Sequence, residues 1–149
     1  MLYALLCYNS EEVVTSWTKQ EDDAVMARLD VVHRKLASKG KLGPAARLQP
    51  TTAAKTLWKG GGPSLVTDGP YAETKEQLLG FYLVECATID EAVEIARELE
   101  QANPGVGAYE IRPLSLFLTG NLQETAPENK VAADRGFSIG GSGSGARTA

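Results

Sequence analysis

The sequence predicts an α+β fold in which two helices cover one face of an antiparallel sheet, and three observations lead to this prediction. Two stretches carry apolar residues at helical spacing, and each begins with a capping signal. Each of these stretches lies between short apolar stretches typical of strands. The strongest strand candidate is apolar on both of its faces, which indicates burial on both sides of the sheet.

The first third of the chain predicts a strand followed by a long helix. Residues 2–8 form a short apolar run that ends at polar residues, as a buried strand does. A helix is expected from about Lys19 to Lys39, because Thr18 and Glu21 form a capping-box pattern and Gly40 supplies a stop. The apolar residues on its inner face are Val25, Leu29, Val32 and Leu36.

The middle of the chain predicts three short strands. Residues 42–48 and 53–58 are the first two, and the turn at 60–63 leads back into a third at 64–67. We expect the last two to form a hairpin inserted into the fold.

The last third predicts the remaining half of the sheet. Residues 79–86 form the strand that is apolar on both faces, and Thr88 with Glu91 marks the start of a helix that reaches about residue 102. A final strand is expected at 109–118, half-buried at its start.

This order of elements is the split βαβ, ferredoxin-like pattern. Its two helices cover one face of the sheet, so we expect a second copy of the chain to cover the other face in a homodimer. Residues 1–120 form the expected domain, and residues 121–149 are expected to be a flexible Gly/Ser-rich tail. A minor alternative for this tail is a peptide substrate for a modifying enzyme.

Composition excludes several classes of protein. A chain of 149 residues with 43% hydrophobic residues is enough for one packed core, and its formal charge of −4 argues against nucleic acid as a partner. Two cysteines and one histidine allow neither a disulfide framework nor a Cys/His metal site. The N-terminal apolar run is too short for a signal peptide or a membrane span, so a cytoplasmic location is expected.

The most distinctive segment is residues 68–76, Asp-Gly-Pro-Tyr-Ala-Glu-Thr-Lys-Glu. Gly69 and Pro70 predict a tight turn. The segment and its continuation closely resemble the signature of the DGPF (DGPFAETKE) proteins, a branch of the YCII-related family, with Tyr71 where Phe is usual. The resemblance covers about residues 1–118. It implies a fold similar to the dimeric α/β-barrel proteins, which enclose a cleft between sheet and helices, and leaves the biochemical role mostly unassigned.

Asp68 is the first candidate for a catalytic residue. A carboxylate at a strand end can face a cleft, where burial would raise its pKa and suit it to proton transfer. An aspartate at the first position of a turn also accepts backbone hydrogen bonds, which organises a loop without catalysis. The residues alone favour the structural role, and the resemblance brings the two roles to about equal weight.

Glu73, Lys75 and Glu76 follow within what would be one helical turn. They could bind or polarise a small polar substrate, or tie the loop to its own domain through ion pairs. Exposed ion pairs stabilise a protein by only about 0–1 kcal/mol, so partial burial or a ligand explains three charges on one loop better. We take Glu73 and Lys75 as catalytic candidates and Tyr71, Glu76 and Arg47 as substrate-binding candidates.

His33 is the fourth catalytic candidate, as the only side chain whose ordinary pKa lies near neutrality. It lies near the edge of the apolar face of the first helix, where a histidine is more often a core-flanking residue with an exposed ring tip. The resemblance implies a His/Asp pair, which here would be His33 with Asp68. The family histidine lies about a turn earlier, however, where this chain has Leu29.

Two functions from different classes follow. The first is an enzyme or enzyme-like binder that uses an acidic cleft for lyase-like or isomerase-like proton transfer on a small polar or cyclic metabolite. No cofactor is expected, since the glycines form no nucleotide-binding pattern. The alternative is a non-catalytic regulatory module, because DGPF proteins resemble partners of sigma factors and are sometimes linked to transcription.

Overall fold

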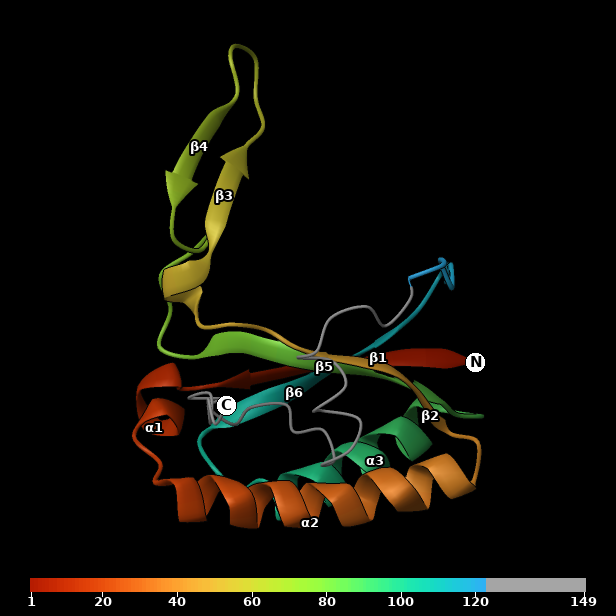
Figure 1. Cartoon of the computed structure of the whole chain (residues 1–149). Helices are drawn as coiled ribbons and strands as arrows, with labels where there is room; N and C mark the ends of the chain where they lie inside the picture. Colours follow the sequence, from red (N-terminus) through yellow and green to blue (C-terminus); the bar gives the residue numbers. More distant parts are fainter. Residues whose placement is uncertain (123–149) are drawn as a thin grey trace.

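The computed structural model describes residues 1–122, which form a four-stranded antiparallel sheet, two long helices on one of its faces, and a separate two-stranded hairpin (Figure 1). The elements in chain order are β1 (Leu2–Asn9), α1 (Glu11–Thr15), α2 (Lys19–Ser38), β2 (Leu42–Arg47), η1 (Thr51–Ala53), β3 (Lys55–Trp58), β4 (Leu65–Asp68), β5 (Gln77–Glu85), α3 (Ile89–Ala102) and β6 (Gly107–Pro113).

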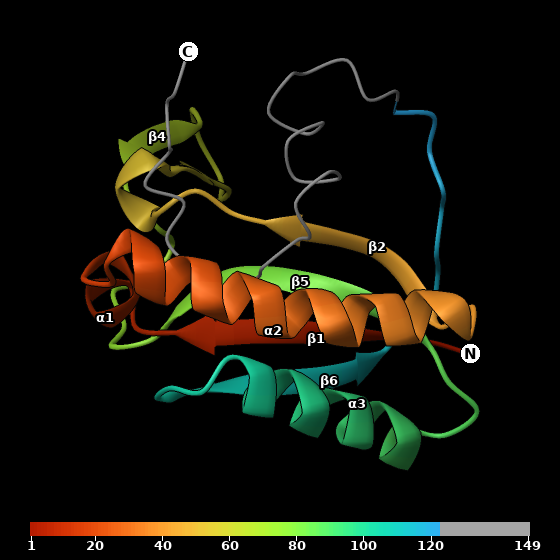
Figure 2. The same cartoon turned by 60° about the horizontal axis from the view of Figure 1, so that its bottom comes forward.

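The strand order in the main sheet is β2-β5-β1-β6, and every neighbouring pair is antiparallel. Leu5 at the centre of β1 faces Tyr82 on β5 and Ile111 on β6. Both helices lie on the same face, with α3 beneath β6 (Figure 2). This α+β arrangement is compatible with the expected ferredoxin-like fold.

The hydrophobic core fills the space between the sheet and the two helices. Leu5 and Tyr82 from the sheet, with Leu29 of α2 and Leu99 of α3, have no exposed surface. Burial of each such aliphatic side chain contributes about 1.5–3 kcal/mol, so this layer supplies most of the stability of the fold.

The two long helices begin where the sequence predicts. The Thr18 side chain accepts from the Glu21 backbone N–H, and the Glu21 carboxylate accepts from Thr18 N, which completes the capping box. Thr88 caps α3 through the N–H of Glu91. Gly40 has a φ of +67°, the left-handed conformation that ends a helix.

The structure differs from the prediction at three elements, of which the first is η1 at Thr51–Ala53, where the start of a strand was expected. The short helix α1, capped by Ser10, was not expected, because five residues are too few to show a helical period. The final strand ends at Pro113 and does not continue to residue 118. The last pair of this strand is Pro113 with Tyr3 of β1, and Leu114 N then donates to the O of Leu2, the first residue of β1.

The predicted hairpin exists, as β3 paired with β4, and stands away from the main sheet on the side opposite the helices (Figure 1). Its apolar side chains Leu57, Leu65 and Val66 are each more than half exposed. We call residues 54–71, which contain this hairpin, the arm.

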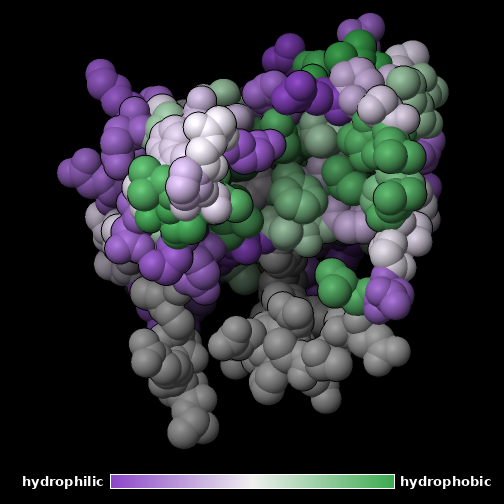
Figure 3. All heavy atoms as spheres, turned by 90° about the horizontal axis from the view of Figure 1, so that it is seen from above, coloured by the Kyte–Doolittle hydropathy of each residue, from purple (hydrophilic) through white to green (hydrophobic). Residues whose placement is uncertain are grey.

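The face of the main sheet that points away from the helices carries apolar side chains without cover from the described residues. Burial alternates along β1, and the half-buried Leu6 faces Phe81 while Ala4 faces Leu83 on this side. On β5, Tyr82 and Val84 on the helical side have no exposed surface, whereas Phe81 and Leu83 on the other side are half-buried. Figure 3 views this open face and shows hydrophobic residues gathered on it.

Candidate functional site

Asp68 ends β4 on the arm, and its side chain is 85% exposed. It forms an ion pair with Lys55 on the neighbouring strand. The tight turn predicted after it is present, since Gly69 has a φ of +103° and donates its N–H to Ala54 O at 2.8 Å. In a single copy of the chain, Asp68 therefore lies on an open strand end and lines neither of the two hollows described below.

Tyr71 lies on the same arm and is 77% exposed. Its ring packs against Trp58 with ring centroids 5.5 Å apart, and the Trp58 indole N–H donates to Thr67 Oγ1 at 2.8 Å. The two aromatic rings give the arm a partly apolar side.

The sequence allowed a loop or a short helical turn for the rest of the distinctive segment, and the structure shows a loop with bends and no helical turn over Glu73, Lys75 and Glu76. The hydrogen bond from Thr74 Oγ1 to Glu76 O closes a bend there instead. Glu73 and Lys75 are exposed, and Glu76 is half-buried at the entry to β5.

The structure brings the end of this segment next to α1. Lys75 and Glu76 line a surface hollow of about 670 Å³, together with Glu11 and Glu12. The other lining residues are Ser10, Val13, Thr74, Gln77 and Val106. We call this the acidic hollow, because three carboxylates and one ammonium group surround it.

Several hydrogen bonds fix the walls of the acidic hollow. The Gln77 side chain accepts from Glu11 N at 3.0 Å and donates to Thr74 O at 2.6 Å, which joins α1 to the segment. The Glu11 carboxylate accepts from both the N–H and the hydroxyl of Thr51, each at 2.7 Å. These bonds hold Glu11, while Glu12 and Lys75 are exposed and available to a ligand.

His33 lies in the core layer and not at the edge expected for it, since only 7% of its surface is exposed. Its Nε2 is 2.9 Å from the Tyr82 hydroxyl, and the two rings are tilted with centroids 5.4 Å apart. Burial lowers the pKa of His33, and nearby Asp30 opposes this effect. The structure does not bring His33 to Asp68, because α2 and the arm lie on opposite sides of the sheet (Figure 1).

Arg47 also points towards the helices, since its neighbour in the sheet is Gly80, which faces Cys7 on the core side of β1. It interacts with Asp22 of α2 through charge, and a buried atom of each group has no hydrogen-bond partner. Burial raises the pKa of Asp22 and lowers that of Arg47, with the attraction between them opposing both changes. Arg47 is thus part of the interior and lines neither hollow.

The sequence reasoning missed Glu11 and Glu12. They appeared only as the polar end of the first strand, and no sequence spacing shows that they lie beside residues 74–77. Ser10, a residue type that caps helices, is followed by the acidic Glu11 and Glu12, and this pattern could have predicted the start of α1.

Within residues 1–122, no group of three His, Cys, Asp or Glu side chains could hold a metal ion. No helix in the same part of the chain has the length and apolar character needed to cross a membrane.

Comparison with known proteins adds a family and one close relative. Residues 1–117 match the model of the YCII-related domain. An uncharacterised protein of Rhizobium meliloti (strain 1021) is 59% identical over 122 residues, which are 82% of this chain and 98% of the relative. The matched region ends near the end of the described structure. Residues 123–149, which hold most of the expected tail, lie outside the residues that the structure describes.

Proposed function

The chain belongs to the YCII-related family, and we propose that it is an enzyme-like binder of a small polar metabolite that works as a cytoplasmic homodimer. One observation carries the proposal: the last residues of the distinctive segment meet α1 around the acidic hollow. The nine residues from 68 to 76 also support assignment to the DGPF branch of the family.

The charges around the acidic hollow favour one kind of ligand. Glu12 and Glu76 accept hydrogen bonds from amine or hydroxyl groups, and Lys75 pairs with a carbonyl or carboxylate oxygen. A small molecule that carries both kinds of group, such as an amino acid or a hydroxy acid, fits this arrangement.

The same groups suit a lyase-like or isomerase-like proton transfer. A glutamate takes a proton from the carbon next to the substrate carbonyl, and Lys75 stabilises the negative charge that develops on the carbonyl oxygen. Return of a proton to the opposite face of the same carbon completes an isomerisation by inverting that centre, so no other reactant is needed.

A homodimer accounts for the exposed apolar surfaces. Leu57, Leu65 and Val66 on the arm and the open face of the sheet would be covered by a second copy. A two-stranded hairpin is only marginally stable by itself, which favours a partner for the arm. We propose that this copy completes the surroundings of Asp68, Tyr71 and Glu73.

A thermal-shift screen tests the ligand site. The full chain is screened against amino acids, hydroxy acids and lactones, and each hit is repeated with Glu76→Gln and Lys75→Met. The hit should lose its stabilising effect in both variants and keep it in Glu94→Gln, a control whose carboxylate is 70% exposed on α3. An equal response in all four proteins would place the ligand elsewhere.

Light scattering tests the homodimer. The expected mass is about twice the 15.9 kDa of one chain. Leu57→Glu puts a charge on the 60% exposed arm position and should give monomers, whereas Val31→Glu, at a 68% exposed position on α2, should not. A wild-type monomer at micromolar concentration would contradict the homodimer.

The regulatory module is the second candidate, and the same exposed apolar surface favours it. Its partner would be a different protein that covers the arm. A wild-type monomer that gains stability with no member of the screen, but binds a defined protein through Leu57, would support this second function.

A further inference from the structure

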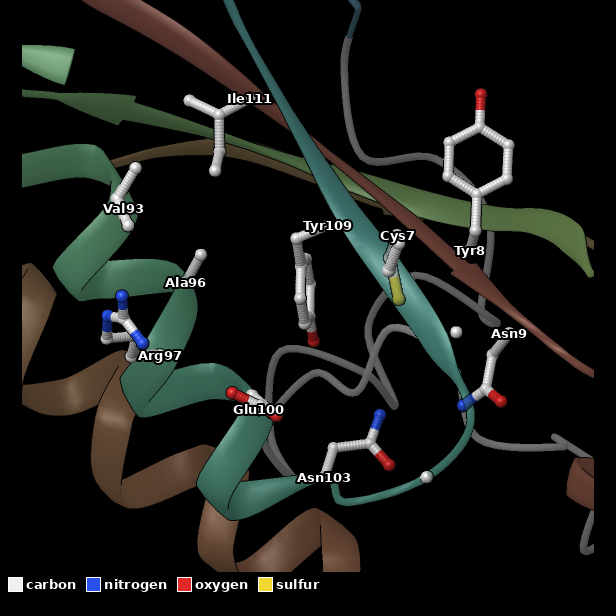
Figure 4. A pocket seen from close by; sticks show the side chains of 13 residues that line it. Cys7, Tyr8, Asn9, Val93, Ala96, Arg97, Glu100, Asn103, Tyr109 and Ile111 are labelled. Carbon is white, nitrogen blue, oxygen red and sulfur yellow. The ribbon is translucent and has the colours of Figure 1, made fainter. Parts of the chain in front are cut away.

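A second hollow lies on the helical side of the sheet, between the edge strand β6 and α3. It has a volume of about 310 Å³ and is lined from β1, α3, β6 and the loop between the last two (Figure 4). Val106 lines the acidic hollow while Gly105 and Gly107 line this one, so the two hollows are separated by a single turn of the chain. We call it the β6/α3 cavity.

The walls of the β6/α3 cavity divide into an apolar side and a polar side. Val93, Ala96 and Ile111 form the apolar side. The polar side is deeply buried, and its members are Cys7 with 2%, Asn9 with 6% and Asn103 with 6% of their surface exposed, together with the buried hydroxyl of Tyr109. In Figure 4 the Cys7 sulfur, the Asn103 amide and the Tyr109 hydroxyl lie around one space.

These polar groups are neutral at ordinary pH. Burial raises the pKa of the Cys7 thiol to about 11, with Tyr109 opposing the effect. Burial is the main cause that raises the pKa of Tyr109 above its ordinary value, and the nearby Cys7 raises it further. The charged lining residues, Arg97 and Glu100, are exposed and therefore lie at the rim.

The Tyr109 hydroxyl retains capacity to bind a ligand. Its polar neighbour is the Cys7 thiol, and sulfur is a weak hydrogen-bond acceptor. A carbonyl oxygen in the cavity would accept a stronger bond from this hydroxyl, and a buried hydroxyl gains most from such a partner.

Two glycines shape the entrance. A Cβ atom on Gly107 would lie 2.1 Å from Tyr8 O, so the close approach of β6 to β1 requires glycine there. A Cβ atom on Gly105 would lie 3.4 Å from Asn9 Nδ2, so a larger side chain would occupy the space next to the polar side. The absence of side chains at both positions leaves the polar side open.

We propose that the β6/α3 cavity is a binding site for a small neutral molecule with an apolar body and a carbonyl or carboxamide group. The apolar body contacts Val93, Ala96 and Ile111, and the carbonyl accepts a hydrogen bond from Tyr109. A charged group is disfavoured because no buried charge in the lining would compensate for the loss of its hydration. This site is separate from the acidic hollow and does not depend on the function proposed for it.

Benzamide is a suitable probe, because it combines an aromatic ring with a neutral carboxamide. The full ¹⁵N-labelled chain is titrated with benzamide and, in parallel, with benzoate, and the amide signals are followed by NMR. Benzamide should cause saturable shifts around residues 7–9 and 103–109 with a Kd of about 1 mM or tighter. Benzoate should bind at least about tenfold more weakly.

Matched variants locate the contacts. Tyr109→Phe should weaken benzamide binding about fivefold to tenfold through the lost hydroxyl, and Ala96→Leu should abolish binding by filling the cavity. Tyr8→Phe is the control, since the Tyr8 ring points away from the cavity in Figure 4 and its variant should bind benzamide as the wild type does. The signals of each variant first establish that its fold is retained, and Tyr109→Phe keeps the test valid if Ala96→Leu does not fold.

Absence of saturable shifts at 7–9 and 103–109 would overturn the proposal. Equal affinities of the wild type and Tyr109→Phe would also overturn it, because the hydroxyl would then have no part in binding.

Discussion

Replacement of Tyr82 by phenylalanine separates a structural role of His33 from a catalytic one. The change removes the hydroxyl that lies 2.9 Å from His33 Nε2 and keeps the ring, which is fully buried in the core. Both residues are at least nine-tenths buried, so water does not compete for this hydrogen bond and the bond contributes to the stability of the fold.

Loss of this hydrogen bond should lower the free energy of unfolding by about 1–2 kcal/mol. For a folded region of 122 residues the entropy of unfolding is about 0.25 kcal/mol per kelvin, so the melting temperature should fall by about 4–8 °C. The cost arises in the core, and ligand binding at the acidic hollow should not change.

Urea unfolding and calorimetry measure the effect, at one protein concentration because the stability of a homodimer depends on it. Tyr71→Phe is the control, since it removes a hydroxyl from a side chain that is 77% exposed and should change stability by less than about 0.5 kcal/mol. If Tyr82→Phe behaves like Tyr71→Phe, the bond does not stabilise the fold. If Tyr82→Phe abolishes the response to a screened ligand, His33 belongs to the site after all.

Three other predictions concern the fold. Stability should decrease as the pH falls below about 6.5, because burial lowers the folded-state pKa of His33 and the unfolded chain then binds a proton that the native state does not. Urea titrations of His33→Gln should lack this decrease from pH 6.5 down to the lowered pKa. Thr18→Ala should cost about 1 kcal/mol through loss of the α2 cap, and a change below a few tenths would contradict the importance of the capping box. Gly107→Ala should cost more than about 2 kcal/mol because of the clash with Tyr8 O, while Gly61→Ala, whose Cβ meets no atom within 4 Å, should melt like the wild type.

Much of the fold could be predicted because its signals are local. The period of apolar residues and the caps at Thr18 and Thr88 placed both long helices. The Gly-rich turn after Trp58 placed the hairpin. The end of β6 at Pro113 could not be found this way, because it depends on where β1 begins.

The candidate site was less accessible to sequence reasoning, because it depends on residues that are distant in the chain. The segment 68–76 was identified, but only its last residues meet α1, and they do so from a loop and not from a helical turn. His33 and Arg47 were named as functional, yet both lie in the layer between helix and sheet, where α2 and the neighbouring strands supply their partners. No local sequence pattern shows whether such a side chain points into the layer between helix and sheet or towards solvent.

The most direct test of the central claim is an NMR map of the binding site for the strongest hit of the thermal-shift screen. The acidic hollow predicts shifts at residues 10–13 and 74–77 in the wild type, and loss of these shifts in Glu76→Gln. Saturable shifts confined to other residues, or shifts that persist unchanged in Glu76→Gln, would contradict the assignment of the acidic hollow as the binding site of this protein.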